Sequence, residues 1–193
     1  MSDSLDAQLR MVWPASRLSV LPTVDPPAGY AIRLCSPADE PRHGEFMALA
    51  GWRGWADEYG DVALCTVLLC SWFLAVHEAS DTPVASAMRC HNYKGTTPYW
   101  GGVGWVGCDP AHTGRGLGGV LTSAVVSRFL DIGYERINLY SEDFRLPALQ
   151  THLRVGVLPL LHTDDMPGRW RVICDAVRWP FTPDEWPSAT PFV

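Results

Sequence analysis

The stretch of this sequence best suited to chemistry is a glycine-rich turn that leads into an apolar segment. Residues 108–119 read CDPAHTGRGLGG, and VLTSAVVSRFL follows directly. Glycines let a backbone approach a ligand closely, and the N-terminus of a following helix adds unpaired N–H groups and a positive dipole end. The turn therefore predicts a diphosphate-binding loop, to which Arg115 would add a charge-assisted contact. A glycine-rich turn without a ligand is the alternative.

Within this turn, residues 114–119 match the spacing G-x-G-x-x-G, which is typical of dinucleotide-binding folds. Glu142 and Asp143 follow at about the distance at which such folds place a ribose-binding carboxylate. However, residues 109–113 separate the glycines from the preceding strand, whereas the dinucleotide motif begins directly at the strand end. The sequence therefore favours a different cofactor, and an NAD(P)-binding oxidoreductase is the less favoured alternative.

The residues on both sides of the glycines carry a resemblance to a known family. A strand ending in Val106-Gly107-Cys108, then x-Pro, a short loop, G-R-G-x-G and a long helix resemble the acetyl-CoA-binding motif of the GCN5-related N-acetyltransferase (GNAT) family. In that family a β-bulge lets the strand pair with the pantetheine arm, while loop amides hold the pyrophosphate. The resemblance covers about residues 29–165 and implies acetyl-CoA as the cofactor. The residues it places at the cofactor, mainly through backbone, are Val106, Gly107, Cys108, Thr113, Gly114, Arg115, Gly116, Leu117, Gly118 and Gly119.

The turn departs from the family pattern at Thr113, where the family has Gln or Arg. Arg115 compensates for that side chain, or the backbone amides suffice alone. Cys108 is expected to contribute its backbone only and not to act as a nucleophile.

A second family signature matches residues 145–157, RLPALQTHLRVGV. Ala148 and Gly156 stand in place, whereas Arg145, His152 and Val157 replace the family's Asn, Tyr and Phe. The family's tyrosine lies near the cofactor sulfur and protonates the leaving thiolate. His152 is therefore the candidate general acid, because an imidazolium is a competent acid near neutral pH. The alternative is a packed helix-face histidine in a non-catalytic acyl-CoA-binding or interaction module.

An acceptor amine must also lose a proton before or during its attack on a thioester. The side chains able to take that proton are Glu78, His91, Asp109, His112 and Glu142. Glu142, directly after the strand at 136–141, is kept as the candidate base, and His112 is expected to serve loop structure. Five tryptophans fit either an acceptor pocket or the core: Trp52, Trp55, Trp72, Trp100 and Trp105.

The elements that must position these residues follow from periodicity and from turn residues. Strands are expected at 30–35, 71–78, 84–93, 99–108, 136–141 and 157–162, and helices at about 37–50, 117–132 and 145–155. Ser36 is the expected N-cap of the first helix. Residues 51–71 and 167–177 fit either helix or strand. With the resemblance, this order predicts an α/β fold of three layers, in which helices flank a mixed, mainly antiparallel sheet whose central split holds the cofactor.

The composition predicts one globular domain, because 47% of the 193 residues are hydrophobic and 19% are charged. The expected organisation is an irregular, proline-rich lead-in over 1–28, the acetyltransferase-like domain over 29–178 and a Pro/Trp-rich tail over 179–193. The net charge of −6 argues against nucleic acid or an anionic membrane as partner.

The six cysteines are scattered without C-x-x-C spacing, so neither a metal site nor disulfides are expected. The N-terminal residues lack the apolar region of a signal peptide, and the apolar run at 62–76 is too short to span a bilayer. We therefore expect a cytoplasmic protein. The resemblance implies an enzyme that moves an acetyl group from acetyl-CoA to a primary amine of a small molecule or peptide by direct attack. In the family, the first-helix region and the hairpin determine which acceptor is bound. Dimers are common in the family.

Overall fold

The computed structural model describes residues 8–52, 67–92 and 99–188, apart from the side chains of residues 67–71. Most of the ambiguous segment at 51–71 lies outside the described residues. Its last residues, from Val67, belong to a strand.

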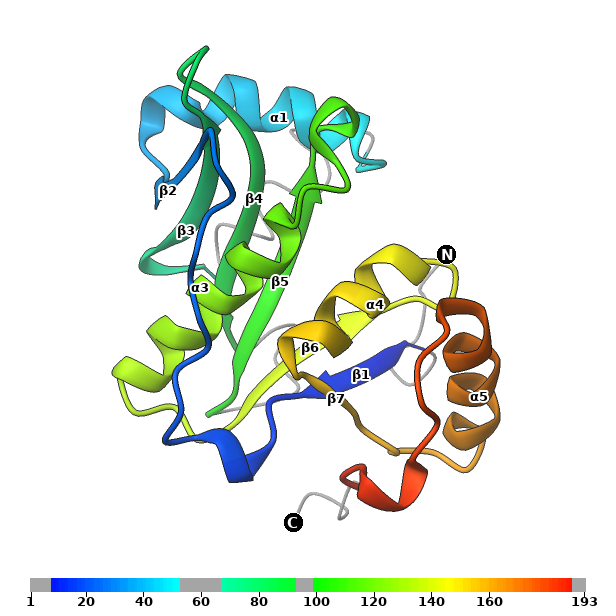
Figure 1. Ribbon diagram of the computed structural model, residues 1–193. Helices are drawn as coiled ribbons and strands as arrows, with labels where there is room; N and C mark the ends of the chain where they lie inside the picture. The colour runs from blue at the N-terminus through cyan, green and yellow to red at the C-terminus, as the bar shows by residue number, and fades with distance from the viewer. Residues whose placement is uncertain (1–7, 53–66, 93–98, 189–193) are drawn as a thin grey trace.

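The centre of the molecule is a seven-stranded sheet of order β2-β3-β4-β5-β6-β1-β7 (Figure 1). Its strands are β1 (Leu9–Val12), β2 (Tyr30–Leu34), β3 (Val67–His77), β4 (Thr82–His91), β5 (Gly101–Cys108), β6 (Ile137–Ser141) and β7 (Leu158–Pro159). Strands β5 and β6 run parallel, and the other neighbouring strands are antiparallel. The mixed, mainly antiparallel sheet expected from the sequence is confirmed.

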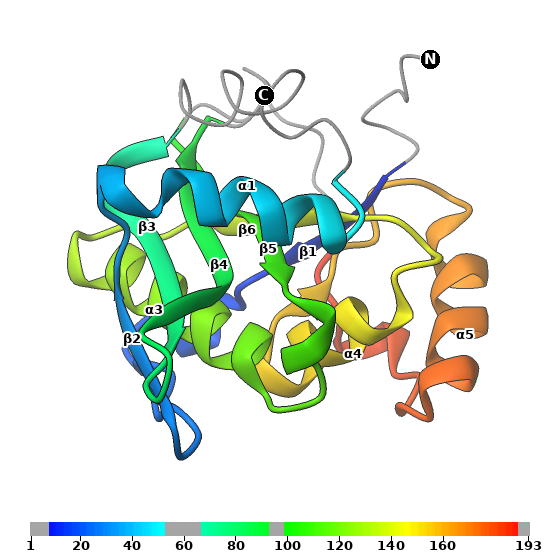
Figure 2. The same cartoon turned by 90° about the horizontal axis from the view of Figure 1, so that it is seen from above.

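Helices cover both faces of this sheet, which completes the expected three layers (Figure 2). The helices are α1 (Glu40–Leu49), α3 (Leu117–Asp131), α4 (Leu146–Val155) and α5 (Met166–Val177). A Cβ at Gly107 of β5 would meet Met47 of α1, whereas one at Gly101 would meet Phe129 of α3. These two helices therefore pack on opposite faces of the same strand.

Two hydrophobic clusters correspond to the two faces. The larger one joins α3, α4 and α5 to the sheet and includes Leu121, Phe129 and Trp170. The smaller one lies under α1 and includes Phe46, Met47 and Trp105. The sheet thus carries apolar contacts on both sides, as a central sheet between helix layers requires.

The turn that leads into α1 follows the sequence prediction for Ser36. Ser36 and Asp39 form a capping box around a 3-10 turn over Pro37–Asp39, and α1 begins directly after it at Glu40. The Arg33 guanidinium holds Asp39 with two hydrogen bonds of 2.7 Å, which lowers the pKa of that carboxyl well below its usual range. This ion pair ties α1 to the edge strand β2.

The open choice at 167–177 is resolved as the helix α5. Its buried residues are Met166, Trp170, Ile173, Cys174 and Val177. Their spacing of three or four residues is that of one helical face. In the proline-rich tail, Trp186 is buried and packs edge-on against Trp170 of α5, with 6.0 Å between ring centroids. The tail is thus a surface-packed arm over this helix.

The prediction of an irregular lead-in over 1–28 is wrong at Leu9–Val12. This segment is β1, which lies between β6 and β7 and pairs Leu9 with Ser141 and Met11 with Pro159. Leu9 and Met11 are fully buried. Four residues are too few to show a strand period, and their partners lie more than a hundred residues away in the chain. The strand expected over 157–162 is also shorter, because β7 ends at Pro159.

Candidate active site

The sheet opens between its two parallel strands. Strands β5 and β6 pair only at Gly101 with Ile137 and at Gly102 with Asn138. Beyond these pairs the strands diverge, with β5 running toward α1 and β6 running under α4 (Figure 1). From Val103 onward, the edge of β5 that faces β6 therefore makes no ladder with another described strand.

A β-bulge lies where this opening begins. Between Ser86 and Met88 of β4 there is one residue, whereas between their partners Gly107 and Gly104 there are two. Trp105, inside the bulge, has a φ of 53°, which is rarely adopted by a residue with a side chain. The bulge that the family resemblance implied is confirmed.

Buried polar groups hold this bulge in place from the side of α1. The Ser86 hydroxyl donates to the Trp105 carbonyl oxygen at 3.4 Å, and Nε2 of His43 lies 3.0 Å from the same hydroxyl. His43 is fully buried, and burial lowers its pKa to about 3, so the ring is neutral. Helix α1 thus supports the strained segment of β5 through a short chain of hydrogen bonds.

The glycine turn after β5 exposes backbone donors. Gly114 and Gly116 have φ values of 74° and 83°, in the left-handed region that favours glycine. Helix α3 begins at Leu117, and within the described chain the N–H groups of residues 114–118 have no backbone acceptor. Thr113 and Arg115 are exposed beside them. The turn therefore offers several amides and a helix N-terminus to an anion, as the sequence predicted.

The loop between β5 and this turn is anchored by two of the residues that were candidate bases. Asp109 accepts from Arg42 of α1 at 2.6 Å and from the Ala111 N–H at 3.0 Å. Burial raises the pKa of Asp109, but these two partners outweigh it, so the pKa is lowered. His112 is bonded through Nδ1 to the Tyr30 hydroxyl at 2.8 Å. Both side chains are thus engaged by elements that hold the loop.

Cys108 is half-buried at the end of β5. Burial raises the pKa of its thiol to about 11, so the thiolate is absent at neutral pH. A neutral thiol is a poor nucleophile, which agrees with the expectation that this residue contributes only backbone.

A cavity of about 90 Å³ lies in the opening, bounded by β5, β6 and α4. It brings together Val106, Glu142 and His152, which were predicted from the sequence, with Trp52, Trp105 and Tyr140. Two other candidate bases lie elsewhere. His91 bonds to the Tyr134 hydroxyl at the closed end of the split, and Glu78 follows β3 in a turn.

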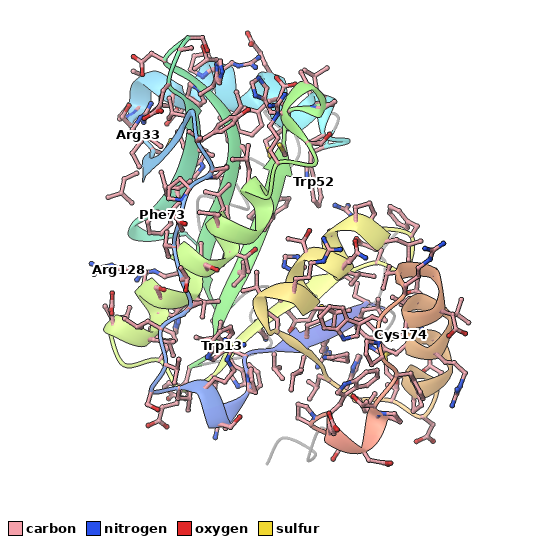
Figure 3. The ribbon with its side chains drawn as sticks, in the orientation of Figure 1. Trp13, Arg33, Trp52, Phe73, Arg128 and Cys174 are labelled. Carbon is pink, nitrogen blue, oxygen red and sulfur yellow. The ribbon has the colours of Figure 1, made fainter. Side chains whose placement is uncertain are left out.

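The cavity wall carries a charged pair. Glu142 lies 2.5 Å from Nε of Arg145 and accepts a 2.8 Å hydrogen bond from Nε2 of Gln8. The Arg145 guanidinium lies over the Trp52 ring at 4.3 Å, and Trp52 extends from the end of α1 toward α4 (Figure 3). Gln8 was missed in the sequence, because nothing there links residue 8 to a strand beside residue 142.

His152 lies on the face of α4 that lines the cavity, and its side chain is 5% exposed. Its Nδ1 lies 3.4 Å from the Thr122 hydroxyl of α3. Burial lowers the pKa of His152 to about 4, so the resting ring is neutral. An acid role at neutral pH therefore requires that the ring first takes up a proton.

The other tryptophans are divided between core and surface. Trp72 packs edge-on against His43, Trp100 is half-buried just before β5, and Trp55 lies outside the described residues. Among the described residues, no group of three side chains is arranged to hold a metal ion. No helix in the described part of the chain is long and apolar enough to cross a membrane.

Comparison with known proteins decides the family. The family model described as "Acetyltransferase (GNAT) family" matches residues 35–157. The chain belongs to the GNAT family. This match includes the bulged strand, the glycine turn, His152 and Gly156. The dinucleotide-binding alternative is overturned, since the G-x-G-x-x-G spacing belongs here to the loop of a GNAT sheet with a single parallel strand pair among its described strands.

GNAT relatives and solved structures are similar to parts of the chain. A mycothiol acetyltransferase of Rhodococcus erythropolis is 43% identical over 68 residues, which are 35% of this chain and 23% of the relative. One of Mycobacteroides abscessus is 42% identical over 72 residues, which are 37% of this chain and 24% of the relative. The chain thus spans about a quarter of the length of these relatives.

Among solved structures, a GCN5-related N-acetyltransferase of Sphaerobacter thermophilus is similar with a TM-score of 0.57 and 22% identity. That similarity covers 79% of this chain and 48% of the other. A tandem GNAT protein from the clavulanic acid biosynthesis pathway gives a TM-score of 0.57 and 17% identity over 79% of this chain and 50% of the other. Both show the fold.

A GNAT domain uses acetyl-CoA, and the residues present here fit that cofactor. Beyond its ladder with β6, the edge of β5 can pair with an extended amide-bearing arm, and the amides of residues 114–118, which have no backbone acceptor among the described residues, can bind a diphosphate. The cavity is lined by β5 from Gly102 to Val106 and by His152 of α4.

Proposed function

We propose that this GNAT protein transfers the acetyl group of acetyl-CoA to a primary amine of a small molecule or peptide by direct attack, without an acyl-enzyme. The observation that carries the proposal is the opening of the sheet after Gly102, where the β5–β6 ladder ends and a cavity with titratable side chains lies. Strand β5 leads from this opening to a turn whose amides at 114–118 have no backbone acceptor among the described residues. The neutral thiol of Cys108 supports direct attack, because it is not activated as a nucleophile.

Each part of the site has a role in this proposal. Bound acetyl-CoA would supply an activated thioester. The backbone of residues 106–108 would align its arm, and residues 113–119 would bind its diphosphate. Glu142 is a carboxylate that lines the cavity, and it would act as the general base or bind the ammonium group of the acceptor. His152 lines the cavity and is the proposed proton donor to the leaving sulfur.

The named relatives support a small-molecule acceptor. The cavity of about 90 Å³ can admit the amine-bearing end of such a molecule. The curated relatives are named for mycothiol, although their similarity covers about a quarter of their length. Peptides remain acceptors to be tested, since an N-terminal amine needs no larger space.

The test combines binding and turnover. Calorimetry is expected to show binding of acetyl-CoA and none of NAD(P). A thiol-release assay with amino acids, polyamines, aminoglycosides and peptides is expected to find at least one amine that becomes acetylated. Binding of acetyl-CoA with no release across the panel would replace the proposal by a non-catalytic acyl-CoA-binding module.

A matched pair of glycines tests the cofactor loop. Gly116 and Gly133 stand at opposite ends of α3, both have a φ of 83°, and neither has an atom within 4 Å of the position of an added Cβ. Alanine should therefore cost each position a similar backbone strain of about 1 kcal/mol. Gly116→Ala is expected to weaken acetyl-CoA binding at least fivefold, whereas Gly133→Ala should not. Equal affinities in the two variants would remove the turn from the cofactor site.

A further inference from the structure

The buried Thr122 hydroxyl contacts the His152 ring and bears on which of its two nitrogens carries the proton. Thr122 is fully buried in α3, and its hydroxyl donates to the Gly118 carbonyl oxygen at 2.8 Å. A hydroxyl has one proton, and a carbonyl oxygen can only accept. With its proton directed to this shorter contact with Gly118, Thr122 Oγ1 faces Nδ1 of His152, 3.4 Å away, as an acceptor, and this arrangement favours the tautomer with the N–H on Nδ1.

A neutral imidazole carries only one ring proton, so this assignment leaves Nε2 with a lone pair. Within the described part of the chain, the one hydrogen bond of the His152 ring is the bond to Thr122. The ring lines the cavity, and burial lowers its pKa to about 4, which keeps it neutral at rest. In this tautomer, the ring that lines the cavity has one nitrogen able to accept a proton.

The other candidate base is less free to do so. Both carboxylate oxygens of Glu142 are engaged, one by the Gln8 amide and the other by Arg145. His152 has no charged group bonded to its ring among the described residues.

We propose that His152 is a proton shuttle, whose Nε2 takes the proton of the attacking amine and then gives it to the departing sulfur. The nitrogen–carbon bond forms and the carbon–sulfur bond breaks, one proton passes from nitrogen to sulfur, and no oxidant or further reactant is needed. Thr122 is the positioning residue that holds the ring in the required tautomer. The shuttle rests on the proposed amine acetylation.

The shuttle explains how a ring that is neutral at rest can serve as the acid. A tyrosine hydroxyl at this position would carry a proton to donate from the start. Here the proton comes from the substrate, and an imidazolium formed in a buried site is a strong acid toward a thiolate. The two roles that the reaction needs are then carried by one nitrogen.

The first test determines the tautomer of the His152 ring and does not depend on enzymatic turnover. Protein labelled with ¹⁵N in its six histidines is observed at pH 7 by long-range ¹H–¹⁵N correlation, and His152→Gln assigns the ring of residue 152. The expected pattern is a protonated Nδ1 and an unprotonated Nε2. Thr122→Val should abolish this preference. A native ring protonated at Nε2, or an imidazolium, overturns the shuttle.

The second test separates turnover from cofactor binding. His152→Gln is expected to lower kcat about a hundredfold or more, which is typical for loss of acid–base catalysis. Thr122→Val should lower kcat about tenfold and leave the KM for acetyl-CoA within about twofold, because it alters only the tautomer population. Thr151→Val is the matched control, since the Thr151 hydroxyl makes the same 2.8 Å bond to the carbonyl four residues earlier.

The outcomes distinguish this inference from the function on which it rests. Normal kcat in Thr122→Val, or an equal loss in Thr151→Val, refutes the shuttle while amine acetylation stands. A wild-type protein with the expected tautomer that acetylates no amine refutes the proposed function and the shuttle with it. The tautomer of the native protein remains decisive if a variant does not fold.

Discussion

A substitution at Gly107 distinguishes two physical reasons for a glycine in β5, the strand proposed to align the cofactor. From the sequence, this glycine is expected to let the cofactor approach β5. In the structure, a Cβ added to Gly107 would overlap Sδ of Met47 and lie 3.3 Å from its Cε. Met47 is fully buried in the cluster under α1. The glycine is therefore required first by the packing of α1 on the sheet.

Gly107→Ala is expected to lower the free energy of unfolding by about 1–3 kcal/mol, the usual range for overpacking a filled core. Met47 is flexible but enclosed, so part of the overlap must be relieved by a shift of α1. For a chain of this length, that loss corresponds to a fall in Tm of about 2–12 °C. Chemical denaturation and a thermal melt measure both quantities.

Two further variants make the measurement specific. Gly118→Ala adds the same methyl group where the nearest atoms are 3.7 and 3.9 Å away, so packing alone should cost it little. In a Met47→Ala background the overlapping atoms are gone, so Gly107→Ala should cost less than in the native protein. Unchanged stability of Gly107→Ala together with a raised KM for acetyl-CoA would refute this reasoning and restore contact with the cofactor as the reason for the glycine.

Two other predictions follow from the titratable groups. The pKa values of His43 and His152 are lowered from 6.5 to about 3 and about 4, so below pH 6.5 the unfolded chain binds protons that the folded chain does not. Stability is therefore full above pH 6.5 and falls by about 1.4 kcal/mol per pH unit for each histidine as the pH decreases toward 4, which urea titrations between pH 4.5 and 7.5 would show; a flat profile contradicts the burial of these rings as neutral groups. Cys108→Ala should retain acetyl transfer within about threefold, because its thiol is neutral, and loss of transfer by a folded variant in the thiol-release assay would require a covalent route instead.

Much of the architecture could be predicted from the sequence because its signals are local. The apolar spacing of residues 117–132 and the glycines at 133 and 156 mark helices whose ends depend on nearby residues. Ser36 and Asp39 form their capping box within one turn. The glycine turn was equally readable, since Gly114 and Gly116 adopt conformations that few other residues tolerate.

Three features needed the tertiary structure. Residues 9–12 become a strand only because β6 and β7 supply partners and a buried slot. The sequence of residues 167–177 fits either a helix or a strand, and packing of its buried face against α4 and the tail selects the helix. The role of Gly107 depends on a helix that packs from sixty residues away in the chain.

The same division applies to the candidate site. The sequence by itself determined which residue types stand at the cofactor turn and at position 152, because motif spacing is a property of the chain. Only the tertiary structure decided the state of those residues. Burial made the His152 ring neutral, folding placed the Thr122 hydroxyl 3.4 Å from Nδ1 of that ring, and Gln8 with Arg145 engaged Glu142. Protonation depends on the dielectric surroundings and on hydrogen-bond partners brought together by folding, and neither is encoded at neighbouring positions.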